Sequence, residues 1–154
     1  MHVLLASDAQ WVVDEVVAAL GGPETSFTVC RNGRDVTAVV KARTPDLAIL
    51  DLQSGSMGGI AVTMNLRLDE SSGAVPYIPV LMLLDRTADV FLARRSGADG
   101  WLIKPLDALK ICRAVDAILR PPIAVAESLE PEIESAAQSA VQSESTVEEA
   151  VPAG

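Results

Sequence analysis

Short apolar runs alternate with segments of helical periodicity along the first 120 residues. The runs are bounded by turn residues, which is typical of buried parallel strands. We expect five strands, at residues 3–6, 26–30, 47–52, 78–84 and 100–103. Apolar residues near helical spacing predict five helices, at residues 9–20, 34–43, 60–68, 88–96 and 106–119. This alternation predicts an α/β fold with a parallel sheet covered by helices on both faces.

The periodic apolar positions of the helices indicate which side chains reach the core. In the first helix these positions are Trp11, Val12, Val16, Val17 and Leu20. In the last helix they are Leu109, Ile111, Cys112, Val115, Ile118 and Leu119. Gly97 follows the fourth helix and is expected to end it, because glycine adopts the left-handed conformation of a helix C-terminus without strain.

Three of the predicted strands end in charged residues. The first runs into Ser7 and Asp8, the third ends at Asp51, and the fifth runs into Lys104. In an open parallel sheet, chemistry takes place just outside the carboxyl ends of the strands. The two acids and the lysine are therefore expected to share one site.

Composition and charge narrow the function classes. The 154 residues are 49% hydrophobic, enough for one domain with a real core. The apolar stretches are too short for a membrane span, and the N-terminus lacks a secretory signal, so we expect a cytoplasmic protein. A single histidine and two widely spaced cysteines, Cys30 and Cys112, argue against a zinc site or a disulfide and favour buried structural thiols.

The charge is concentrated in the last part of the chain. All 12 Lys and Arg lie in residues 1–120 with 14 acids, a net charge of −2, while residues 121–154 hold seven Glu and no base, a net charge of −7. Neither part has a basic excess, which argues against nucleic-acid binding. We expect a folded domain over 1–120 and an acidic, disordered tail over 121–154, because the tail has too little apolar surface to offset its ordering entropy.

Residues 1–120 resemble the receiver domain of bacterial two-component response regulators. The resemblance is carried by Asp51 after its apolar strand, by Gly59, and by residues 97–105 (GADGWLIKP). It implies a flavodoxin-like fold, with five parallel strands in the order 2-1-3-4-5 flanked by five helices.

The resemblance also implies roles for the residues at the strand ends. Asp51 would accept a phosphoryl group from a sensor histidine kinase or phosphotransfer protein, and Lys104 would contact a phosphoryl oxygen. Weakly bound Mg²⁺ would be held by Asp8, Asp51 and the backbone carbonyl of Gln53, since Mg²⁺ prefers oxygen ligands. The protein would not be an enzyme beyond phosphotransfer onto Asp51 and slow autodephosphorylation.

Several positions depart from the receiver pattern. Receivers usually carry two adjacent acids after the first strand, and here the first is Ser7, which is expected to weaken Mg²⁺ binding. Leu84 replaces the hydroxyl residue at the end of the fourth strand, so Trp101, at the position of the switch aromatic, has no hydroxyl partner to follow. Asp85 is expected to repel a phosphoryl donor unless it faces solvent. Ser54 and Gly55 are expected to loosen the loop after Asp51.

Two functions follow from these matches and departures. The first is an atypical single-domain response regulator that acts through protein–protein contacts, with Asp51 as phosphoacceptor. The second is a phosphorylation-independent pseudo-receiver that serves as a binding or adaptor module. In both, the downstream partner is an unidentified protein. By analogy with receivers, the partner surface would include Trp101 and the residues Val90, Phe91, Arg94, Arg95, Lys110 and Arg113.

Overall fold

The structure, a computed structural model, describes residues 1–120 as five strands and five helices with two short 3₁₀ turns. The strands are β1 (His2–Ala6), β2 (Ser26–Cys30), β3 (Leu47–Asp51), β4 (Val80–Leu84) and β5 (Gly100–Ile103). The helices are α1 (Gln10–Leu20), α2 (Val36–Ala42), α3 (Gly59–Ser71), α4 (Val90–Ser96) and α5 (Ala108–Leu119). The strands form one parallel sheet in the order β2-β1-β3-β4-β5, which confirms the expected fold.

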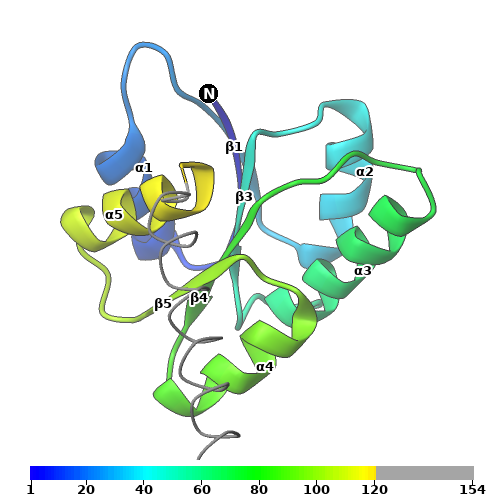
Figure 1. Ribbon diagram of the computed structural model, residues 1–154. Helices are drawn as coiled ribbons and strands as arrows, with labels where there is room; N and C mark the ends of the chain where they lie inside the picture. The colour runs from blue at the N-terminus through cyan, green and yellow to red at the C-terminus, as the bar shows by residue number, and fades with distance from the viewer. Residues whose placement is uncertain (121–154) are drawn as a thin grey trace, which may run out of the picture. The chain divides into compact units, whose positions relative to one another are not determined.

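The three central strands are buried along their whole length. Every residue of β1, β3 and β4 is buried, so their side chains alternate between two apolar layers rather than between core and solvent. One layer joins Leu4 and Leu50 to α2 and α3, and the other joins Leu5 and Ile49 to α1 and α5. Figure 1 shows α1 and α5 on one face of the sheet and α2, α3 and α4 on the other.

The ends of several elements differ from the expected ones for local reasons. β4 begins at Val80 rather than residue 78, because Pro79 has no backbone N–H to give to the sheet. α3 continues to Ser71 and ends just before Gly73, whose φ of 80° is suited to glycine. The second and fourth helices each start with a 3₁₀ turn. Gly97 ends α4 with a φ of 93°, as expected.

Some apolar residues expected in the core lie on the surface. Trp11 is 51% exposed, and Leu109, Val17 and Leu119 are also exposed. The helices are short, and only a narrow stripe of each faces the sheet: Val12, Val13 and Val16 in α1, and Ile111 and Val115 in α5. Periodicity located these stripes but did not fix their edges.

Arg67 on α3 links α3 to the segments at the amino ends of β4 and β5. Its guanidinium donates hydrogen bonds to the carbonyls of Gly97 and Ile78, at 3.0 and 2.9 Å. It also forms an ion pair with Asp99 at 2.7 Å. Asp99 in turn accepts a hydrogen bond from the Val80 backbone N–H at 2.7 Å. We call these contacts the Arg67 clamp.

Both cysteines are free thiols. Cys30 is buried, and burial, together with the charge of Asp35, raises the pKa of its thiol. Cys112 is partly buried, with Sγ 3.3 Å from the Ala19 carbonyl oxygen. Raising the pKa of a thiol lowers the fraction of reactive thiolate, which fits the predicted structural role of Cys30.

Two expectations concern the chain as a whole. Within residues 1–120, no helix has the length and hydrophobicity needed to cross a bilayer. The expected disorder of the acidic tail falls on residues 121–154, outside the described part of the chain.

Two leucines on α3 provide a matched test of the core. Leu66 is 1% exposed and Leu68 is 68% exposed, so Leu66→Ala removes core contacts and Leu68→Ala does not. We expect Leu66→Ala to lower the free energy of unfolding by about 2–5 kcal/mol and Leu68→Ala by less than about 0.5 kcal/mol. Urea denaturation of both variants measures the difference. Equal losses would contradict the assigned orientation of α3.

Candidate functional site

The carboxyl ends of the strands bring the charged residues together at one edge of the sheet. Asp51, the last residue of β3, pairs in register with Leu83 of β4, and Leu84 pairs with Ile103 of β5. Ser7, Asp8 and Lys104 directly follow the ends of β1 and β5. Because all five strands are parallel, these ends meet at the same edge.

Asp51 is the centre of this site. It is 2% exposed, and both carboxylate oxygens accept hydrogen bonds. Oδ1 lies 2.8 Å from the Lys104 ammonium and 3.3 Å from the Gln53 backbone nitrogen, while Oδ2 accepts the Ser7 hydroxyl at 2.8 Å. A buried carboxylate is costly unless it is paired, and Lys104 with Ser7 supplies this pairing.

The residues expected to hold Mg²⁺ surround the loop after Asp51. Asp8 is exposed, and its Oδ2 accepts the Gly55 backbone N–H at 2.9 Å. Within residues 1–120, no group of three or more acidic, histidine or cysteine side chains is arranged to hold a metal ion. Asp8, Asp51 and the Gln53 carbonyl are all oxygen donors, so the donor set fits Mg²⁺ in kind but holds only two carboxylates.

The loop that follows Asp51 is bonded to its surroundings. Ser54 is buried and donates its hydroxyl to the Met57 carbonyl at 3.0 Å, and the Ser56 hydroxyl bonds Asn32. Gly55 is held by Asp8, as described above. The expected loosening by Ser54 and Gly55 is therefore offset by one hydrogen bond within the loop and by hydrogen bonds to two neighbouring segments, at Asn32 and Asp8.

For Asp85 two alternatives were expected, repulsion of a phosphoryl donor or exposure to solvent. Its side chain is 34% exposed, but Oδ1 turns to Lys104 and lies 3.3 Å from the ammonium nitrogen. Lys104 is thus shared by two carboxylates, Asp51 and Asp85. Adjacency to a strand end was a signal for Asp85, but the pairing required the structure.

Trp11 is a site neighbour that sequence reasoning missed. It was expected in the core, whereas the structure exposes its ring and places the Lys104 ammonium 5.6 Å from the ring centroid. This distance is within the range of a cation–π contact. Helical periodicity alone gave no signal for this position.

Leu84 and Trp101 belong to one apolar cluster. Leu84 is fully buried with Met82 and Ala93, and Trp101 is partly buried against them. The Arg94 guanidinium lies 5.3 Å from the Trp101 ring centroid, on the outer side of the cluster. Trp101 is therefore held between an apolar layer and a cation.

The expected partner-surface residues lie on α4 and α5, on either side of β5 (Figure 1). Phe91 is 65% exposed, and the Arg95 guanidinium is 5.9 Å from its ring centroid. Arg94, Arg95, Lys110 and Arg113 are exposed, and Val90 is partly buried. Lys110 pairs with Asp107 at 3.7 Å, while within residues 1–120 neither Arg94 nor Arg95 forms an ion pair.

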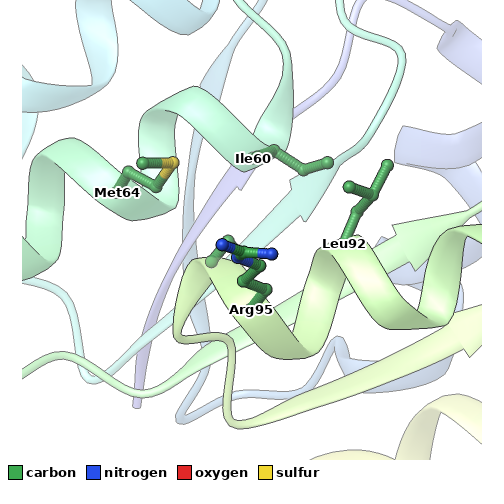
Figure 2. A pocket seen from close by; sticks show the side chains of 5 residues that line it. Ile60, Met64, Leu92 and Arg95 are labelled. Atoms are coloured by element: carbon green, nitrogen blue, oxygen red, sulfur yellow. The ribbon is translucent and has the colours of Figure 1, made fainter.

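A pocket of about 190 Å³ lies between α3 and α4. In Figure 2, Ile60 and Met64 of α3 face Leu92 and Arg95 of α4 across it. The lining is mostly apolar, with the Arg95 side chain as its charged member. Sequence reasoning had singled out only Arg95 among these residues.

Comparisons with known proteins identify the family to which this fold belongs. The sequence profile of the response regulator receiver domain matches residues 3–116. The chain is 25% identical to Protein PilH of Pseudomonas aeruginosa, over 77% of this chain and 97% of that protein. It is 30% identical to the transcriptional regulatory protein CseB of Streptomyces avermitilis, over 77% of this chain and 49% of that protein. The chain thus spans about half the length of CseB.

Solved structures show the same fold. The chemotaxis response regulator CheY4 of Vibrio cholerae superposes with a TM-score of 0.68 at 22% identity, over 77% of this chain and 98% of CheY4. A two-component response regulator from Clostridium difficile gives a TM-score of 0.67 at 20% identity, over 79% of this chain and 97% of that one. With the family profile covering most of residues 1–120, the chain belongs to the response regulator receiver domain family.

Proposed function

We propose that this receiver accepts a phosphoryl group on Asp51 and passes the signal on through protein–protein contacts, with a weakened metal site and switch. The observation that carries the proposal is the 2.8 Å contact between Lys104 and the buried Asp51 carboxylate at the carboxyl edge of the sheet. This pair provides an acceptor oxygen and a cation beside it.

Several residues at the carboxyl edge of the sheet would contribute to phosphotransfer, each in a different way. A carboxylate is a weak nucleophile, so catalysis depends on positioning and on screening of the clustered negative oxygens. Ser7, Lys104 and the Gln53 backbone hold Asp51 in one orientation. Mg²⁺, held by Asp8, Asp51 and the Gln53 carbonyl, would add positive charge against the phosphoryl oxygens. The chain would thus catalyse only its own phosphorylation and slow dephosphorylation.

The partners follow from this role. Receiver domains interact with histidine kinases or phosphotransfer proteins, and we propose one of these as the donor. For the output we propose the surface of α4, β5 and α5, where Arg95 lies beside the exposed Phe91 ring and Arg94 beside the Trp101 ring. An exposed aromatic side chain next to arginines is a composition typical of the energetic centres of protein interfaces.

The departures weaken the coupling between Asp51 and that surface. Leu84 cannot donate a hydrogen bond to a phosphoryl group. Trp101 is packed against the Leu84 cluster and Arg94. We therefore propose that phosphorylation changes the output surface only slightly.

An alternative is a pseudo-receiver that binds partners without phosphorylation. Its supporting observation is that the site is already satisfied: both Asp51 oxygens accept hydrogen bonds, and Lys104 pairs with two carboxylates. A site whose hydrogen bonds are complete without a phosphoryl group needs no phosphorylation to hold its structure. The two functions differ in whether Asp51 reacts.

Incubation with acetyl phosphate and Mg²⁺ decides between them. We expect intact-protein mass spectrometry to show one added phosphoryl group, because Asp51 is the acceptor, and to show none in Asp51→Asn. A histidine kinase is not needed for this reaction, since the donor is chemical. Absence of an adduct in the unmodified chain over hours would support the pseudo-receiver.

Leu84→Thr tests the missing switch. Trp11→Phe leaves Trp101 as the sole tryptophan, because the chain has two. In this background we expect phosphorylation to change Trp101 fluorescence more in Leu84→Thr than in the parent, since threonine can donate a hydrogen bond to the phosphoryl group. Leu84→Val is the matched control, with the shape of threonine and no hydroxyl. An equal change in the Thr and Val variants would show that the hydroxyl does not couple the two sites.

A further inference from the structure

Asp85 pairs with Lys104, the cation that phosphotransfer needs. It follows β4 directly, and its carboxylate lies 3.3 Å from the Lys104 ammonium, which also lies 2.8 Å from Asp51. The Trp11 ring is the third neighbour of this ammonium, at 5.6 Å. Lys104 is therefore already engaged before any donor arrives.

We propose that Asp85 is a specificity-determining residue, which makes the site disfavour phosphoryl donors in proportion to their negative charge. It does so by competing for Lys104 and by adding a negative charge at the site. This inference rests on the proposed phosphorylation of Asp51.

The electrostatics of the edge support this role. Asp8, Asp51 and Asp85 bring three negative charges to the site, and Lys104 brings one positive charge. The nearby cation Arg86 forms an ion pair with Asp89 at 3.1 Å instead. The Lys104 side chain is only 12% exposed, so its interactions are less screened by salt than those of surface charges. A donor oxygen must compete with Asp85 for the protons of this partly buried ammonium.

Two small donors differ in charge while transferring the same group. Near neutral pH acetyl phosphate is a dianion, and phosphoramidate is a monoanion that carries its own ammonium. In both reactions an Asp51 oxygen forms a bond to phosphorus with its lone pair. The bond from phosphorus to the leaving group breaks, and acetate or ammonia departs with that bond's electron pair. No oxidant, reductant or further proton is required.

Asp85→Asn removes the charge and keeps the shape of the side chain. Because a charge–charge energy is proportional to each charge, the gain in rate for the dianion should be about the square of the gain for the monoanion. We expect initial rates of adduct formation, measured by intact mass with Mg²⁺ present, to rise about tenfold with acetyl phosphate and about threefold with phosphoramidate.

Asp116→Asn is the matched control, because it removes one exposed acid from α5 and leaves the site intact. It should leave both rates and their ratio unchanged. If Asp85→Asn raises the rates of adduct formation with both donors by the same factor, the proposal is overturned, since a structural disturbance does not distinguish donor charge. No change in either rate would overturn it as well. Thermal unfolding verifies that both variants are folded.

The two levels of the proposal fail in different ways. If neither donor labels the parent or Asp85→Asn, the proposed function fails and the donor specificity falls with it. If Asp51 is labelled but Asp85→Asn raises the rates with both donors by the same factor, the proposed function stands and only the role of Asp85 is removed.

The contact between Asp85 and Lys104 has its own measurement: the ¹⁵N chemical shift of the Lys104 ammonium should move in Asp85→Asn and not in Asp116→Asn. An unmoved shift would show that Asp85 does not hold Lys104.

Discussion

The parallel direction of the five strands is the constraint from which the arrangement of the site follows. The central strands are buried throughout, so a charged side chain cannot sit along their length without losing its hydration. Their carboxyl ends are the first positions where polar groups reach one another and water. Asp51 occupies the last position of β3, where its carboxylate is almost fully buried and still meets Lys104 and Ser7. The backbone thus brings these groups to one edge of the sheet, and the directions of the side chains decide which of them pair.

The fold could be predicted because its signals are local and repeated. The buried runs of β1, β3 and β4 and the periodic stripes of α1 and α5 are each readable within a few residues, and the alternation then fixes the class of fold. The strand order needed the resemblance to receivers. Element ends were less certain, since Pro79 and Gly73 act on hydrogen bonds and backbone angles that a hydrophobic pattern does not record.

The site was predictable in its members but not in its pairings. Asp8, Asp51 and Lys104 stood out because they follow strand ends. The contact of Asp85 with Lys104 and the position of Trp11 over the same ammonium depend on side-chain directions at the ends of elements, where sequence spacing carries no information. Ser7 illustrates the same point: as a replacement for an acid it predicted weaker Mg²⁺ binding, and the structure adds that its hydroxyl donates a hydrogen bond directly to Asp51.

The Arg67 clamp gives the domain one edge that resists displacement. It joins α3 to the segments that lead into β4 and β5, at the opposite end of these strands from Asp51. In a rearrangement that begins at the carboxyl edge, these contacts would act as a pivot at the amino edge. Rotation about such a pivot moves atoms in proportion to their distance from it, so the start of α4, near Val90, would travel farther than its end at Gly97. An arginine remote from the chemistry thus ties α3 to the amino ends of β4 and β5.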